Sequence, residues 1–285
     1  NGGSTSASGG TAHASTGAIG DGDAGDGPVN AAGGVAGGSS GGSGSGSGGK
    51  PANNGGGGAG GGSGGLVSGA GAAPVDATLI DDFEDGDKII VIVNNPRRDG
   101  IWDTNYDTTA SGVQTPVPSM FAPTLLGADA PRAGDMYAAH STGSGFTAAG
   151  FGAYMNVSMR AVANYALTPV YDASSYKGIS FLAKASTASS KIMRVRFVSG
   201  DTDPRLNKCT VPGTSETACY NHYYATVTLT TAWAVHSVDF SSFVQGTNGM
   251  MNPSGIDLKE MYGLEFYFDP PSNYDLWLDD LSFTK

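Results

Sequence analysis

The chain has 285 residues, which allows about two domains, and a net charge of −11 from 26 acidic and 15 basic residues. Scattered Lys and Arg in an acidic chain argue against a nucleic-acid partner, since phosphate neutralisation needs clustered positive charge. No run of about 18 apolar residues occurs, so no transmembrane segment is expected.

Residues 1–75 hold 30 of the chain's 46 glycines and no aromatic residue. Gly, Ser and Ala make up 54 of these 75 residues, so too little apolar surface is present to offset the entropy of ordering. We therefore expect a disordered linker or tether with a reach of roughly 45–50 Å. The start at Asn1 rather than Met leads us to expect a processed product, secreted or at the cell surface. A bacterial outer-membrane lipoprotein, with a lipid anchor on a Cys before Asn1, is one form of this expectation.

Residues 76–285 contain all the aromatic residues and predict one folded domain. KIMRVRFVS at Lys191–Ser199 and YGLEFYFD at Tyr262–Asp269 alternate between apolar and polar residues, which indicates half-buried strands. The alternation recurs in Tyr176–Ala185, Tyr223–Leu229 and Trp233–Phe240. Roughly ten strands and a single helical turn near Asp257–Met261 predict an all-β fold, an antiparallel β-sandwich of jelly-roll type.

The polar face of these strands interleaves charged residues with tyrosine: Arg194, Arg196, Glu265, Tyr267 and Asp269. A sugar ring has an apolar CH face that stacks on an aromatic ring, and hydroxyls that need fixed donors and acceptors. The pattern is therefore suited to a sugar-binding cleft. Any solvent-facing sheet shows the same alternation, and this alternative stays open.

Cys209 and Cys219 lie ten residues apart with Pro212 and Gly213 between them. This spacing suits a disulfide that closes a small loop, and the alternative is two free buried thiols. His222 follows on the same loop, where it is either a ligand contact or a structural residue. The histidines show no HExxH or HxH spacing, so a catalytic zinc is not expected.

Acidic clusters open and close the domain, at Asp81–Asp87 and Asp275–Asp280. If the ends of the sandwich lie side by side, a bound Ca²⁺ would remove the repulsion between these carboxylates. Two solvated acidic turns are the alternative. A glycosidase acid–base pair would need two carboxyls at a defined separation, and a sequence does not give that separation.

Four segments together resemble a carbohydrate-binding module, of the family 11-like, galactose-binding-domain-like jelly-roll type. They are LIDDFEDGD (Leu79–Asp87), GIWDTNYD (Gly100–Asp107), YKGISFLAKAS (Tyr176–Ser186) and YDLWLDDLSF (Tyr274–Phe283). The resemblance spans residues 78–284 and none of the tether. One departure is Leu182, which stands where such modules often carry an aromatic residue.

The resemblance implies non-catalytic binding of a β-glucan-like polysaccharide and a structural calcium ion. The implied calcium ligands are Glu84, Asp85, Asp87, Asp279 and Asp280. The implied ligand-binding residues are Trp102, Tyr106, Arg194, Arg196, Asp201, His222, Tyr223 and Tyr267. The expectation is therefore a binding module and not an enzyme. A structural or adhesive surface protein is the first alternative, and a polysaccharide hydrolase or lyase is the second.

Overall fold

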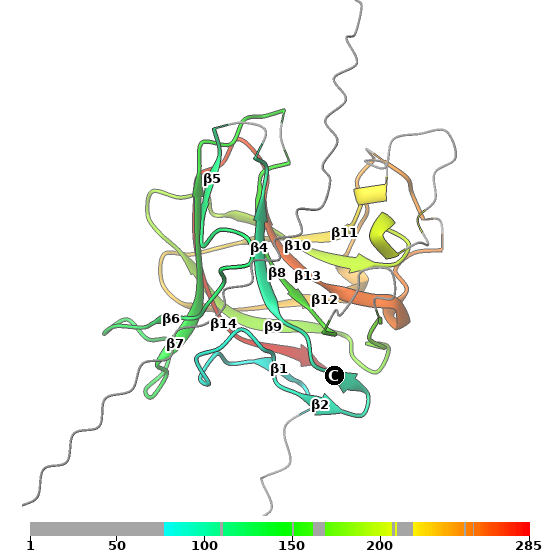
Figure 1. The fold of residues 1–285 in the computed structure, drawn as a ribbon, viewed down its shortest axis with the longest axis horizontal. Helices are drawn as coiled ribbons and strands as arrows, with labels where there is room; N and C mark the ends of the chain where they lie inside the picture. Colours follow the sequence, from blue (N-terminus) through cyan, green and yellow to red (C-terminus); the bar gives the residue numbers. More distant parts are fainter. Residues whose placement is uncertain are drawn as a thin grey trace, which may run out of the picture. The chain divides into compact units, whose positions relative to one another are not determined.

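The computed structural model describes residues 77–108, 111–149, 151–161, 169–206, 209, 219–247, 249–252 and 254–285. The described residues all belong to one compact unit, Leu66–Lys285. The predicted tether at residues 1–75 lies outside them. Where the structure describes the chain, its regular structure is mostly antiparallel β-strand, arranged in two main sheets (Figure 1).

One main sheet has seven strands, in the order β12–β9–β14–β7–β5, with β1 beside β14 and β6 beside β7. Its strands are β1 (Leu79–Asp81), β5 (Val113–Thr115), β6 (Thr124–Leu125), β7 (Tyr137–Ser144), β9 (Gly178–Ala185), β12 (Ala234–Asp239) and β14 (Tyr274–Thr284). The long β14 pairs with β1, β7 and β9. The first and last described strands are therefore neighbours in this sheet, as was expected for the acidic ends.

The other main sheet has five strands, in the order β11–β10–β13–β8–β4 (Figure 1). Its strands are β4 (Trp102–Tyr106), β8 (Ala153–Ser158), β10 (Ile192–Ser199), β11 (Tyr223–Thr228) and β13 (Met261–Phe268). A short hairpin of β2 (Val93–Asn94) and β3 (Arg97–Arg98) stands apart. Single 3₁₀ turns occur at η2 (Pro204–Leu206), η4 (Phe240–Ser242) and η5 (Leu258–Glu260), and η5 confirms the predicted helical turn.

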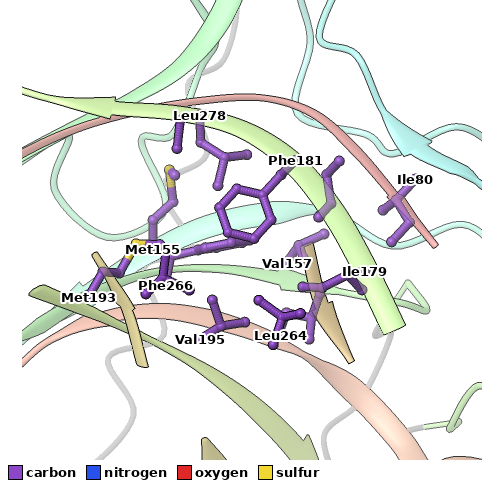
Figure 2. Close-up of a cluster of buried hydrophobic side chains, with 14 of the residues drawn as sticks. Ile80, Met155, Val157, Ile179, Phe181, Met193, Val195, Leu264, Phe266 and Leu278 are labelled. Carbon is purple, nitrogen blue, oxygen red and sulfur yellow. The ribbon is translucent and has the colours of Figure 1, made fainter. Parts of the chain in front are cut away.

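The core lies between the two main sheets and is built from the predicted apolar faces. Met193, Val195, Leu264 and Phe266 are 0% exposed, and Figure 2 shows them facing Phe181 and Leu278 of the opposite sheet. Burying each such side chain contributes about 1.5–3 kcal/mol. The antiparallel β-sandwich predicted from the alternation is confirmed.

Trp102 is one of the largest core side chains, with no exposed surface. Its ring stacks on Phe266 at 5.9 Å between ring centroids, and its Nε1–H donates to the buried carboxylate of Asp81 at 2.7 Å. The expectation that Trp102 contacts a ligand is therefore wrong. The side chain points inward because it is on the same face of β4 as the buried Thr104.

Arg98, at the end of β3, is also 0% exposed. Its guanidinium donates to the carbonyl oxygens of Ala77, at 3.1 Å, and Leu79, and lies 5.7 Å from the centre of the Phe283 ring. Burial of a cation is costly unless hydrogen bonds compensate it. Arg98 therefore fixes the first described residues against the last strand.

Candidate functional site

Two adjoining hollows lie on the outer face of the five-stranded sheet, and together they form the cleft. The first, here the polar hollow, has a volume of about 240 Å³, and the second, the aromatic hollow, about 440 Å³. Asn105, Tyr154 and Glu265 line both hollows, which makes the cleft continuous. The polar hollow also includes Asp103, Ser119 and Asn156, and the aromatic hollow adds Phe151, Arg196, Tyr220 and His222.

Strand alternation explains why these side chains meet. In β8 the apolar Ala153, Met155 and Val157 enter the core, so Tyr154 and Asn156 face outward. Tyr154 pairs with Asn105 of β4 on one side, and Asn156 pairs with Glu265 of β13 on the other. Neighbouring strands lie about 4.8 Å apart, so these outward side chains form one continuous lining.

Exposed aromatic rings mark the aromatic hollow. Phe151 is 46% exposed and Tyr220 is 44% exposed, although large aromatic side chains usually gain from burial. Phe151 lies 6.4 Å from Tyr154, and Tyr220 lies 6.1 Å from His222, between ring centroids. The hollow thus offers ring surface that the fold itself does not cover.

Hydrogen bonds hold the polar hollow in one arrangement. Asn105 Nδ2 donates to the Tyr154 hydroxyl at 2.9 Å. Asp103 Oδ1 accepts from the backbone N–H groups of Ser119, at 2.6 Å, and Thr104, at 2.8 Å. A lining that is fixed before a ligand arrives lowers the entropy cost of binding.

Two arginines lie over tyrosine rings on the same outer face. The Arg196 guanidinium lies 3.2 Å from the centre of the Tyr267 ring, and its Nη1 is 3.4 Å from Glu265 Oε2. Arg194 lies 4.5 Å from the centre of the Tyr224 ring and pairs with Asp269 at 2.9 Å. Burial raises the pKa of the Tyr267 phenol, so this ring stays neutral at physiological pH.

A disulfide joins Cys209 and Cys219 at the edge of the aromatic hollow, so the alternative of two free thiols is wrong. Tyr220 and His222 follow directly. Between them, Asn221 Nδ2 donates to the carbonyl oxygens of Gly246, at 2.8 Å, and Met250, at 3.1 Å. His222 Nδ1 lies 2.9 Å from Thr202 Oγ1, and which of these atoms donates depends on the imidazole tautomer. The wall of the hollow is therefore attached to the fold at three places.

Half of the predicted ligand-binding residues lie at this face. Arg196 and His222 line the aromatic hollow, and Arg194 and Tyr267 belong to the layer beside it. The placements of Arg194, Arg196 and Tyr267 agree with the predicted polar face of β10 and β13, and His222 lies just before β11. Their contact with a ligand remains a prediction.

The other predicted ligand-binding residues lie elsewhere, Trp102 being in the core. Tyr106 packs partly buried against the core, 6.4 Å from the Phe146 ring. Tyr223 is on the inward face of β11 and 4% exposed. Asp201 lines a separate hollow, where it accepts from Asn252 Nδ2 at 3.1 Å. The expectations for Tyr106 and Tyr223 are wrong because both side chains face inward. Asp201 lies outside the cleft, and its contact with a ligand remains a prediction.

Leu182 stands where carbohydrate-binding modules of the resembled type often carry an aromatic residue, and its position shows whether the cleft lacks a stacking ring. It lies in β9 of the seven-stranded sheet and lines a hollow there together with Val235. It therefore lies outside the cleft. The substitution removes no stacking surface from the cleft.

The predicted calcium ligands do not converge. Asp85 and Asp87 are exposed, and each accepts a hydrogen bond from a backbone N–H two residues ahead. Both carboxylate oxygens of Glu84 accept from the backbone N–H of Met136, Oε1 at 2.9 Å and Oε2 at 3.0 Å. Asp280 pairs with Arg132. In the part of the chain that the structure describes, no three His, Cys, Asp or Glu side chains are grouped closely enough to hold a metal ion.

Among the predicted calcium ligands, Asp279 differs in having a buried carboxylate oxygen without a hydrogen-bond partner among the described residues. It is 1% exposed, and Oδ2 has no hydrogen-bond partner among the described residues. Burial raises the pKa of this carboxyl to about 8. One such oxygen is not a site, because Ca²⁺ takes six to eight oxygen ligands. The predicted calcium ion stays a prediction.

The sequence matches no known family model and no curated protein. The structure is similar to two solved structures of a family 11 carbohydrate-binding module from Clostridium thermocellum. The first, from a cellulosomal cellulase, shows 16% identity and a TM-score of 0.42 over 72% of this chain and 92% of that one. The second, in complex with a β-1,3-1,4-mixed-linked tetrasaccharide, shows 17% identity and a TM-score of 0.42 over 73% and 94%.

A family 30 carbohydrate-binding module, from another cellulosomal cellulase of Clostridium thermocellum, shows 14% identity and a TM-score of 0.36. This similarity covers 65% of the present chain and 98% of that module. All three TM-scores are below 0.5, so the function proposed below depends on the geometry of this chain.

Proposed function

We propose that the cleft binds a carbohydrate without altering it chemically. The observation that carries this proposal is that two exposed aromatic rings, Phe151 and Tyr220, line the cleft together with polar side chains fixed on the neighbouring strands. Ligand sites are typically concave and mostly apolar, with a few polar groups fixed in position. The two hollows together have this composition.

Each half of the cleft suits one part of a sugar. An aromatic ring packs its face against the apolar CH face of a pyranose, and Tyr220 also has a hydroxyl that can stay in water. The amides of Asn105 and Asn156 and the carboxylates of Asp103 and Glu265 offer donors and acceptors for hydroxyls. A saccharide spanning both hollows would use both kinds of contact.

Affinity electrophoresis of the full chain tests the proposal directly. Native gels contain a mixed-linked β-glucan, xyloglucan, mannan or xylan, with calcium present. Retardation by one polymer is expected, and Tyr220→Ala and Phe151→Ala should each weaken it about tenfold or more. Val235→Ala is the control, because Val235 is 70% exposed on the other sheet. No retardation in any gel would favour a structural or adhesive role.

The enzymatic alternative has one specific observation in its favour, because Asp103 and Glu265 both line the polar hollow. A glycosidase needs two carboxyls across the scissile bond. Incubation of the chain with the retarding polymer should therefore be followed by an assay for new reducing ends. We expect none, and their appearance at a rate lowered by Glu265→Gln would replace binding with hydrolysis.

We also propose that the chain works outside the cytoplasm, at the cell surface or secreted. The disulfide supports this, because disulfides persist in oxidising compartments. Within the described residues, no helix is long and apolar enough to cross a membrane. Labelling of Cys209 and Cys219 by a membrane-impermeant thiol reagent, on intact cells and only after reduction, is the expected result.

A further inference from the structure

Charge is distributed unevenly along the cleft. The carboxylates of Asp103 and Glu265 line the polar hollow, and none of the described residues that line it is a Lys or Arg. The aromatic hollow adds Arg196 and His222. The whole chain has a net charge of −11. A saccharide carrying carboxylates would meet like charge in the polar hollow, whereas a neutral one would not.

Arg196 is the cation that could offset this repulsion, but its neighbours already engage it. Glu265 is its direct cross-strand partner, and the Tyr267 ring covers the guanidinium on β13. The side chains of Arg196 and Glu265 are only 18% and 6% exposed. A guanidinium paired in this way is less available to bind a carboxylate on a sugar.

We propose that the Glu265–Arg196 pair makes the cleft selective for neutral polysaccharides over acidic ones, an inference that rests on the proposed function. Glu265 accepts hydrogen bonds from sugar hydroxyls at the junction of the two hollows. At the same time it neutralises the one arginine that lines the cleft among the described residues. Glu265 is thus the residue that determines this selectivity.

The test compares two polymers with one backbone. Soluble mixed-linked β-glucan serves as the neutral polymer, and the same glucan oxidised to carboxylates at C6 serves as the acidic one. The wild-type full chain should bind the neutral form at least about tenfold more tightly. If another neutral polymer is the one that retards the chain, its own oxidised derivative takes this place.

Glu265→Gln frees Arg196 and removes one negative charge from the cleft. We expect this variant to lose about tenfold in affinity for the neutral glucan and to gain affinity for the oxidised one, so that the preference largely disappears. Asp269→Asn is the matched control. It removes one negative charge from the same face and frees Arg194, which lines neither hollow. The control should keep the wild-type preference.

The possible outcomes distinguish a failure of the selectivity from a failure of the proposed function. Equal wild-type binding of both polymers overturns the selectivity, and so does an equal effect of Glu265→Gln and Asp269→Asn. No binding of any polymer overturns the proposed function, and the selectivity with it. Should Glu265→Gln fail to fold, Arg196→Gln replaces it. That variant leaves Glu265 unneutralised and should widen the preference for the neutral glucan, and an unchanged preference would refute the inference.

Discussion

Among single residues, Asp81 has the environment with the clearest consequence for stability. Its carboxylate is 1% exposed and accepts from Trp102 Nε1 at 2.7 Å and from Phe83 N at 2.9 Å. Burial is the largest influence, and the nearby charges of Asp85 and Asp82 act in the same direction, so that the pKa rises to about 7. The folded protein therefore holds a proton that the unfolded chain releases near pH 4.

This difference gives stability a pH dependence of known sign. Between about pH 4 and pH 7 the folded state binds the extra proton, so the contribution of Asp81 to stability falls as the pH rises. Asp81→Asn removes this contribution. The stability advantage of the wild type over the variant should be largest near pH 4 and shrink toward pH 8, as measured by urea unfolding in EDTA. A difference that stays constant with pH would refute the raised pKa.

Arg98 is the second single residue whose surroundings lead to a prediction about stability. Arg98→Ala leaves the carbonyl oxygens of Ala77 and Leu79 without this donor and opens space beside Phe283. We expect a loss of about 3 kcal/mol in the free energy of unfolding. The neighbouring Arg97 is the control, since its side chain is 64% exposed, and Arg97→Ala should cost less than about 1 kcal/mol. Equal losses in the two variants would mean that the buried contacts of Arg98 add nothing to the free energy of unfolding.

Among the structural elements, the segment that follows the Cys209–Cys219 disulfide forms part of the cleft wall. Cys219 is adjacent to Tyr220, so the bond to Cys209 limits where the exposed ring can lie. Replacing both cysteines by serine should cost about 2–3 kcal/mol of stability and weaken carbohydrate binding several-fold. Affinity electrophoresis of the folded variant checks the second effect. Unchanged retardation would show that Asn221 and His222 hold the wall without the disulfide.

The strands also show which features a sequence can predict. The inward faces of β10 and β13 follow from period-two alternation, because a half-buried strand must place every second side chain in the core. The same rule applied to Ala153–Ser158 would have placed Tyr154 and Asn156 outward. The cleft itself depends on register, since Asp103 pairs with Asn156 and Asn156 with Glu265 across three strands distant in sequence. No local pattern encodes those pairings.

For the whole molecule, the calcium expectation assumed that the ends of the sandwich lie side by side, and β1 does pair with β14. The individual ligand positions were not predictable. Local turns engage Asp85 and Asp87, and Arg132, which is remote in sequence, engages Asp280. Side-chain competition of this kind depends on the packed fold. It explains why composition pointed to two acidic segments at the ends of the domain but could not predict what each carboxylate contacts.

Removal of metal is the corresponding test on the whole protein. If calcium binds the folded state alone, EDTA lowers the melting temperature, and the shift grows with the calcium concentration that is removed. Calorimetry of the calcium-loaded and EDTA-treated chain measures it, with Mg²⁺ as the control ion. An identical melting temperature in protein shown to start calcium-loaded would exclude a structural calcium.

The pairing of β1 with β14 has a practical consequence. Leu79 is opposite Ser282 in the seven-stranded sheet, whereas the cleft is on the outer face of the five-stranded sheet. Both ends of the described fold therefore leave from the layer that does not carry the cleft. Coupling to a sensor chip or a bead through the C-terminal Lys285, which directly follows β14, would present the cleft toward the solution.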